Sequence, residues 1–351
     1  MSCLGISVKD ISSKIKNEYY EFEENLQSCS KNIYNSTGKG YLFNAYNILQ
    51  LLNLIVKQGV RIDPKKVKST EIQEFKTAWD KLEKPLLSFF SDYIFGQFKI
   101  NNSSIVPRNL ALLPIMVYFY EIYNKGFGFK NLSGDNLKKI NQYFIKSQIN
   151  DWSLQSYADN FTRIIKEKSS SSSGLFDFPL QEIESYISER KLRNIEIHEQ
   201  SFVGYVWFTL KILTPERMYQ FEPDMQGRFN PEIDHIFPNK LVGKTPEYDK
   251  AVNIIWNMQP TKGEINGYKT NIHPKEFFTD KAVNKKGDRI IGSKYISEYD
   301  FLFPTDKNGQ IDFLNEIWEK PIDFINTRKM KMTEFLKNKY DIEFKKEGLN
   351  A

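Results

Sequence analysis

Four polar residues in the second half of this chain have the types and spacing needed to hydrolyse a phosphodiester. Asp234 and His235 are adjacent at the end of an apolar run, and Asn257 and Asn266 follow, nine residues apart. Neutral imidazole can accept a proton from water near pH 7, and carboxylate and amide oxygens are ligands that Mg²⁺ prefers. His235 is therefore a candidate general base, and Asp234 and Asn266 are candidate ligands of one divalent metal ion. The chain has only three histidines, which gives this arrangement weight.

A β-hairpin and a short helix are the elements predicted to position these residues. Apolar runs at Ile233–Phe237 and Val252–Met258 stand on either side of a loop rich in Pro and Gly, which favours two paired strands. Thr261–Thr270 is the predicted helix, and Thr261 and Glu264 have the spacing of a capping box at its start. The segment therefore reads as strand, loop, strand and short helix.

The end of the first strand decides whether its two polar residues can act together. Neighbouring residues on a strand point to opposite faces of a sheet. Asp234 and His235 therefore serve one site only if the strand bends or ends there. Pro238 cannot continue a central strand, so it favours such an end.

Three basic residues near the hairpin are candidate contacts to DNA phosphates. Lys262 and Lys269 lie four residues before and three after Asn266, so they would share its face of the predicted helix. Arg228 comes just before the first strand. The alternative for the two lysines is that they are solvated helix residues without a ligand.

These residues together resemble the ββα-metal HNH nucleases. The resemblance is carried by the following residues: Asp234, His235, Ile236, Pro238, Asn257, Thr261, Asn266 and Lys269. The run Asn-Met-Gln-Pro-Thr from Asn257, followed by Asn266 and by 271–278, is more specifically similar to the C-terminal HNH domain of GmrSD-type restriction proteins. That family consists of defence nucleases directed against phage DNA.

The resemblance implies a role for each residue. His235 would be the general base, Asp234 and Asn266 would hold Mg²⁺, with Mn²⁺ as the alternative metal, and Asn257 would tie the loop to the hairpin. The usual third histidine of an HNH site is replaced here by Asn266. The Asp-Gly-Gln-Gln-Arg signature of a nucleotide-sensing module is not found. That module is on another chain, or the protein works without it, or the sequence is a fragment. A separate nucleotide-sensing subunit and a homo-oligomer are the candidate partners.

Most of the remaining chain predicts helices, because apolar residues recur with a period near 3.6. The predicted helices are Leu42–Val56, Ile72–Phe95, Leu110–Tyr123, about Asn136–Lys146, Leu154–Glu167, Leu180–Lys191, Ser201–Leu213 and Ile311–Leu336. The aromatic residues of 89–98 are expected to form core rather than a platform for stacking bases. The predicted fold class is mainly α, with a helical N-terminal region followed by a helical region that carries a ββα-metal HNH motif.

Five consecutive serines at 169–173, followed by Gly174, mark the candidate domain boundary. Such a run has little apolar surface to bury, so it indicates a linker, or alternatively a loop within one domain. The predicted organisation is an all-helical domain at 1–168 for recognition or regulation, a linker or loop at 169–174, and a nuclease domain at 175–351. The ββα core would span about 228–275.

Composition places limits on the class of protein. A net charge of +5 is compatible with a polyanionic partner such as DNA but too small to demonstrate one. The two cysteines, Cys3 and Cys29, form no metal-binding pair, and no apolar run is long enough to span a bilayer. A cytoplasmic protein without a membrane partner is expected. The leading function is a metal-dependent DNA endonuclease or nickase in antiviral defence; a noncatalytic nucleic-acid-binding subunit and an HNH-type ribonuclease are the alternatives.

Overall fold

The computed structural model divides into two units, Met1–Ile197 and His198–Ala351. It describes residues 13–36, 42–62, 69–100, 103–190, 197–198, 208, 212, 231–240, 246, 252–284, 286–293 and 303–345. Within these residues the chain is mainly helical, as predicted, and none of the helices is long and apolar enough to cross a bilayer.

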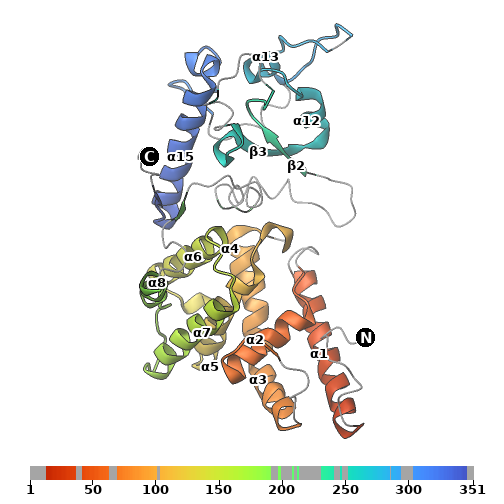
Figure 1. Ribbon diagram of the computed structural model, residues 1–351, viewed down its shortest axis with the longest axis vertical. Helices are drawn as coiled ribbons and strands as arrows, with labels where there is room; N and C mark the ends of the chain where they lie inside the picture. The colour runs from red at the N-terminus through yellow and green to blue at the C-terminus, as the bar shows by residue number, and fades with distance from the viewer. Residues whose placement is uncertain are drawn as a thin grey trace. The chain divides into compact units, whose positions relative to one another are not determined.

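The first unit is built from helices (Figure 1). They are α1 (Ser13–Ser36), α2 (Ala45–Lys57), α3 (Ser69–Ser88), α4 (Gly96–Phe98), α5 (Leu113–Asn124), α6 (Gly134–Ile149), α7 (Gln155–Ser170) and α8 (Leu180–Glu189). A π-helical segment, Phe89–Phe95, joins α3 to α4. The six helices predicted between 42 and 191 are confirmed, with ends that move by a few residues. Helix α1 was not predicted, although Phe22, Leu26, Cys29 and Ile33 recur at helical spacing and are buried.

The core of this unit is aromatic. Phe89, Phe90, Tyr93 and Phe98 are at most 1% exposed, so they are core residues, as predicted, and not a surface for stacking bases. Phe89 meets Phe119 of α5 edge to face, with ring centroids 5.6 Å apart. Most residues of α5 are buried, and α2, α3 and α7 pack against it.

The serine-rich segment lies inside the first unit and is ordered. Ser169 is part of α7, is 3% exposed, and donates from its hydroxyl to Glu121. Lys125 donates to the carbonyl of Ser172 over 2.6 Å. Of the two alternatives, the structure therefore shows an ordered segment and not a flexible linker at 169–174. The boundary between the units lies at Ile197/His198 instead.

Three ion pairs fasten the chain that follows the serines to the helices before them. Lys139, Lys146 and Lys168 pair with Asp177, Glu184 and Glu182 respectively, at 2.7–2.9 Å. Two of these carboxylates belong to α8, which therefore belongs to the helical unit. The Lys139 and Lys168 pairs are exposed, and such pairs contribute only about 0–1 kcal/mol each. The buried apolar residues of α8, Leu180, Ile183 and Ile187, therefore carry most of its stabilisation.

The described part of the second unit contains an antiparallel pair of strands, two short helices and one long C-terminal helix. Its elements are β2 (Pro231–His235), β3 (Met258–Lys262), α12 (Gly263–Lys269), α13 (Pro274–Phe278), α15 (Pro321–Tyr340) and β4 (Phe344–Lys345), with β1 (Ile197–His198) at the unit boundary. The helix predicted at 311–336 begins only at Pro321, because 311–320 forms a bridge, a turn and a 3-10 turn at Glu316–Glu319. The helix predicted at 201–213 falls almost wholly outside the described residues.

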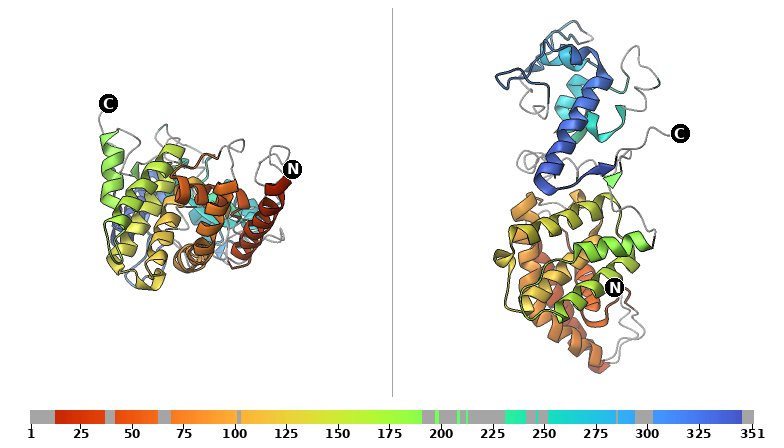
Figure 2. Two further views of the ribbon diagram at one scale, coloured as in Figure 1. Left: turned by 90° about the horizontal axis from the view of Figure 1, so that it is seen from below. Right: turned by 90° about the vertical axis from the view of Figure 1, so that its left-hand side faces the viewer.

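Helix α15 packs against the segment that leads into β3 (Figure 2). Arg328 of α15 is 1% exposed and donates from Nη1 to the carbonyl of Trp256 over 2.5 Å. Burial lowers the pKa of Arg328 to about 9. This contact ties the C-terminal helix to the backbone just before the second strand, so α15 supports the hairpin from outside.

Candidate active site

The predicted strand–loop–strand–helix arrangement is present in the second unit. Strand β2 pairs antiparallel with β3, with Asp234 opposite Gln259 and His235 opposite Met258. Helix α12 follows β3 without a break (Figure 1). Strand β2 ends at His235, as the position of Pro238 predicted.

The second strand and the helix start later than predicted. Residues 252–257 form a turn that ends in a 3-10 segment, and β3 begins only at Met258. Thr261 lies within β3 and is fully buried, so it does not cap α12, and Lys262 is the last residue of β3 rather than a helix residue. Thr261 and Lys262 pair with residues of β2, so they belong to the strand, although local spacing alone assigned them to the helix.

Asn257 holds the end of β2 against the turn before β3. Its side-chain Oδ1 accepts from the N–H of Phe237, and its Nδ2 donates to the carbonyls of Phe237 and Val252, all at 2.9 Å. Its own carbonyl accepts from the N–H of Ile236 over 2.8 Å. Asn257 is fully buried, so these bonds satisfy backbone groups that water does not reach.

Replacing Asn257 with alanine is expected to destabilise the second unit by about 3 kcal/mol or more, because an unpaired buried backbone group costs about 1–3 kcal/mol and three are left. The matched control is Asn253→Ala, which removes an amide that is only half-buried. Hydrogen exchange of peptides that cover β2 would measure both. Equal losses of protection in the two variants would contradict the assigned role of Asn257.

One face of the hairpin carries polar side chains that contact α12. Glu232 and Asp234 alternate along β2, so both lie on the same face of the sheet. The Nδ2 of Asn266 donates to Oε2 of Glu232 over 2.8 Å, and Lys269 Nζ lies 3.0 Å from Asp234 Oδ2. The structure therefore brings the two predicted ligands, Asp234 and Asn266, to one strand–helix interface. Glu232 was missed in the sequence, although two-residue alternation from Asp234 marks it.

Glycine at the start of α12 has a role at this interface. A Cβ added at Gly263 would lie 2.7 Å from Oε1 of Glu232, closer than real Cβ contacts come. The missing side chain lets the Glu232 carboxylate approach the first turn of the helix. Gly263 therefore explains how a carboxylate on β2 reaches Asn266 on α12.

Lys269 is buried inside the site. Its side chain is 0% exposed, and its Nζ donates to the carbonyl of His235 over 2.5 Å as well as contacting Asp234. Burial lowers the pKa of Lys269, an effect that Asp234 partly offsets. The structure contradicts the predicted phosphate contact, because a fully buried ammonium that faces a carboxylate does not reach a DNA backbone. Lys269 instead holds Asp234 and the backbone of His235 together.

The imidazole of His235 lies at the end of β2 beside Asn253. Its Nε2 lies 3.0 Å from Oδ1 of Asn253, and because β2 ends at this residue, strand alternation does not fix the face to which the ring turns. In the tautomer with a proton on Nε2, that nitrogen donates to Asn253, and Nδ1 keeps the lone pair that can accept a proton. The ring is half-buried. Asn253 is thus a partner of the candidate base, a role that residue order alone does not reveal.

The carboxylate and amide oxygens on the α12 face are of the donor types that a hard divalent cation takes. A carboxylate can only accept hydrogen bonds, so Glu232 orients the amide of Asn266 with its NH₂ group toward the carboxylate. Gln259, opposite Asp234, is 1% exposed, and neither side-chain polar atom has a hydrogen-bond partner within the described chain. The described residues contain no group of three or more His, Cys, Asp and Glu suited to a metal, so a metal here would depend on amide oxygens.

Two predicted phosphate contacts are not placed by the structure. Arg228 lies outside the described residues, and of Lys262 only the backbone is described. Apart from His235, the only histidine with a described side chain is His273, which caps α13: its Nδ1 accepts from the N–H of Lys275 over 3.3 Å, and burial lowers its pKa.

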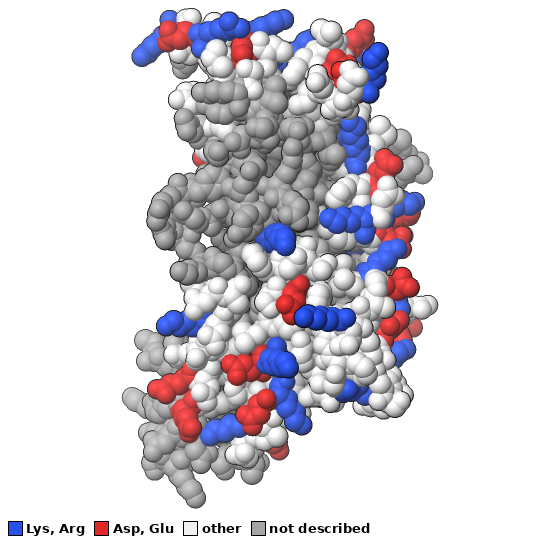
Figure 3. All heavy atoms as spheres, turned by 180° about the vertical axis from the view of Figure 1, so that it is seen from behind, with Lys and Arg blue, Asp and Glu red and all other residues white. Residues whose placement is uncertain are grey.

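Charged side chains do not by themselves mark a nucleic-acid surface. On the face drawn in Figure 3, the described basic and acidic side chains are intermingled. No protein-family model matches the chain, and no curated protein has detectable sequence similarity to it. The hairpin and α12 therefore provide the structural basis for assigning a function to this chain.

Proposed function

We propose that this chain is a metal-dependent HNH-type DNA endonuclease or nickase that acts in restriction of phage DNA. The proposal rests on one observation: the residues stand in the order found in HNH nucleases and also lie on a hairpin followed directly by a helix. An Asp-His pair ends the first strand of an antiparallel hairpin, and the helix that follows directly carries Asn266 against the same strand. A ββα unit with these residues is the arrangement that the HNH resemblance implies.

Each residue has a chemical role in the proposal. Asp234 and the Oδ1 of Asn266 would hold the metal ion, which when bound supplies positive charge for the phosphoryl oxygens and the leaving 3′-oxygen. His235 accepts the proton of the attacking water on the nitrogen that does not face Asn253. Lys269 keeps the carboxylate of Asp234 and the carbonyl of His235 in fixed positions. Asn257 maintains the turn before β3 and takes no part in the chemistry.

A noncatalytic nucleic-acid-binding subunit is the second candidate, and one observation favours it. The ammonium of Lys269 already lies 3.0 Å from Asp234 Oδ2, so a positive charge occupies one side of the carboxylate expected to bind metal. A carboxylate has about four lone-pair sites, so this contact leaves room for a second cation. The two candidates differ in whether the site binds Mn²⁺ and in whether DNA is cut.

A cleavage assay separates these candidates. Purified protein is incubated with supercoiled plasmid, modified phage DNA and RNA, each with Mg²⁺, Mn²⁺ or EDTA. Metal-dependent nicking or linearisation of DNA supports the proposal, and cutting confined to RNA supports the ribonuclease alternative. Absence of cleavage together with absence of Mn²⁺ binding would reject catalysis and favour the noncatalytic subunit.

Replacing Glu232 with alanine is expected to weaken metal binding at this site by about 10- to 100-fold, the usual effect of removing a partner that orients a ligand. Without the carboxylate, the amide of Asn266 is free to turn. Glu232→Gln is the matched control, because its amide oxygen still accepts from Asn266 and keeps the orientation. Mn²⁺ titration followed by electron paramagnetic resonance measures binding directly. Equal affinity in the alanine variant and the wild type would show that Glu232 has no orienting role.

A further inference from the structure

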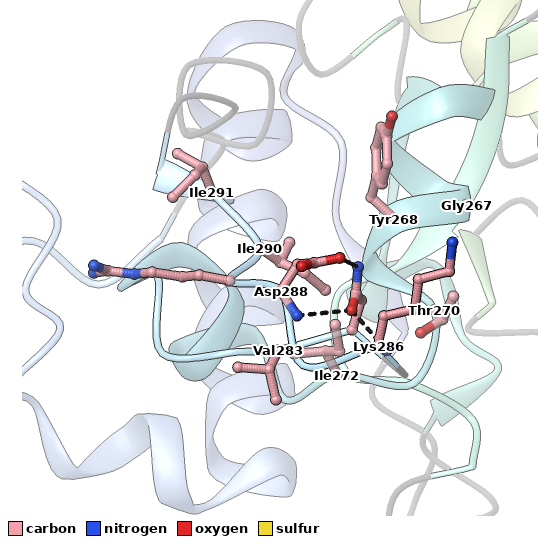
Figure 4. Close-up of a pocket in the computed structure, with 11 residues that line it drawn as sticks. Gly267, Tyr268, Thr270, Ile272, Val283, Lys286, Asp288, Ile290 and Ile291 are labelled. Carbon is pink, nitrogen blue, oxygen red and sulfur yellow. Dashed lines mark hydrogen bonds between the residues drawn. The ribbon is translucent and has the colours of Figure 1, made fainter.

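A hollow of about 700 Å³ lies beside α12, on the side of the helix that faces solvent (Figure 4). This is within the range of about 300–1,000 Å³ typical of sites for small-molecule-sized groups. Tyr268 stands on the α12 side, and Ile291 stands on the side formed by residues 283–291. Tyr268 lies two residues after Asn266 in α12, so the hollow and the candidate metal ligand lie on different faces of the same short helix.

We propose that this hollow binds an unpaired base of the DNA strand on which the site acts. The inference rests on the proposed function, because it takes DNA as the ligand. It assigns the base to the hollow and the neighbouring phosphates to the basic side chains on its rim.

The apolar side chains that line the hollow are better suited to contact with a nucleic-acid base than to contact with water. Tyr268, Val283 and Ile291 line the hollow and are 50%, 61% and 44% exposed, which is unusual for side chains of this size. A tyrosine ring that is half exposed offers a flat surface on which any base can stack. Aliphatic side chains across the hollow can cover the other face of that base.

The charges at the rim fit the sugar–phosphate backbone. Lys286 and Arg289 line the hollow and are exposed, and Arg289 is anchored by donating from Nε to the carbonyl of Asp280 over 2.7 Å. The one carboxylate among the lining residues, Asp288, accepts from the amide of Asn284 over 3.0 Å within the same turn (Figure 4). Two basic residues therefore line the hollow, against one carboxylate that is held within its own turn. This balance suits an anionic strand.

Gly267 leaves the hollow open. A Cβ added there would meet no atom within 4 Å, and its φ lies outside the left-handed region. A larger side chain can therefore start from this position without a clash at its Cβ and reduce the space in the hollow. It also removes a helix-destabilising glycine, so we expect Gly267→Leu to narrow the hollow in a folded protein.

The test measures DNA binding without cleavage. All variants carry His235→Ala and are studied in EDTA by fluorescence anisotropy. The probes are a labelled 15-nucleotide oligothymidine and a 15-unit abasic deoxyribose phosphate chain, which has the same backbone charge and no bases. Because stacking on an aromatic side chain is worth a factor of about 5 to 140 per base, the parent is expected to bind oligothymidine that much more tightly than the abasic chain.

Variants of the hollow should remove this difference. Tyr268→Ala and Gly267→Leu are expected to bind the two probes equally, whereas Tyr268→Phe, which keeps the ring, and Gly134→Leu, a glycine replacement on α6 with open space around it, keep the preference. Lys286→Gln should weaken both probes alike and reduce the salt slope of binding by about 0.7.

The outcomes distinguish this inference from the proposed function. Undiminished preference for oligothymidine in Tyr268→Ala would overturn base binding in the hollow, even if the wild type cuts DNA. Failure of the parent to prefer either probe would overturn it as well. If the wild type cuts no nucleic acid but base binding depends on Tyr268, the hollow stands as a DNA-binding site and catalysis is rejected.

Discussion

Replacing His235 with alanine should lower DNA cleavage by about 10²- to 10⁴-fold, the usual contribution of a positioned general base. The loss should appear in kcat, because the imidazole acts on the proton of water and does not hold the DNA. Asn257 and Lys269 fasten the backbone around His235 through contacts that do not involve its side chain. The fold of the hairpin should therefore survive the change.

The matched control for this variant is His273→Asn. Asparagine accepts from a backbone N–H at a helix N-cap as histidine does here, so α13 keeps its cap and cleavage should stay near the wild-type rate. Plasmid nicking with Mg²⁺ measures both variants, and circular dichroism checks their folding. If His235→Ala cuts DNA as fast as the wild type, this site is not the catalytic one.

Replacing Lys269 with methionine should destabilise the second unit by about 3–5 kcal/mol, because a buried charge loses its partner. The carboxylate of Asp234, 5% exposed, would be left without the ammonium, and the carbonyl of His235 would lose a donor. The double variant Asp234→Asn with Lys269→Met removes both charges, so it should recover part of the loss. Hydrogen exchange of peptides covering β2 and β3 reports this unit separately from the first.

Lys275→Met is the matched control for the buried pair. Lys275 lies 2.6 Å from Glu319, whose side chain is 61% exposed, and exposed pairs contribute only about 0–1 kcal/mol. If Lys269→Met lowers the stability of the second unit no more than Lys275→Met does, the buried pair contributes no more stability than a surface pair. The assigned role of Lys269 in fixing Asp234 would then be rejected.

Local patterns in the sequence predicted the helices of the first unit well and the boundary between the units poorly. Periodic apolar residues are enough to find α2, α3 and α5, because burial of one helical face follows the period itself. A run of serines carries no such period. The serine segment is held by Glu121 of α5 and by Lys125, the residue after α5, and both are distant from the serines in sequence.

The residue types of the candidate site and their order were determined by the sequence alone. Asp234, His235 and Asn266, with a hairpin and a short helix around them, follow from chemistry and spacing. Only the tertiary structure decided how the side chains pair: Glu232 with Asn266, and Lys269 with Asp234. Spacing along a strand or helix determines which residues share a face of that element. The burial of a side chain and its bonding partner depend instead on which other element packs against that face.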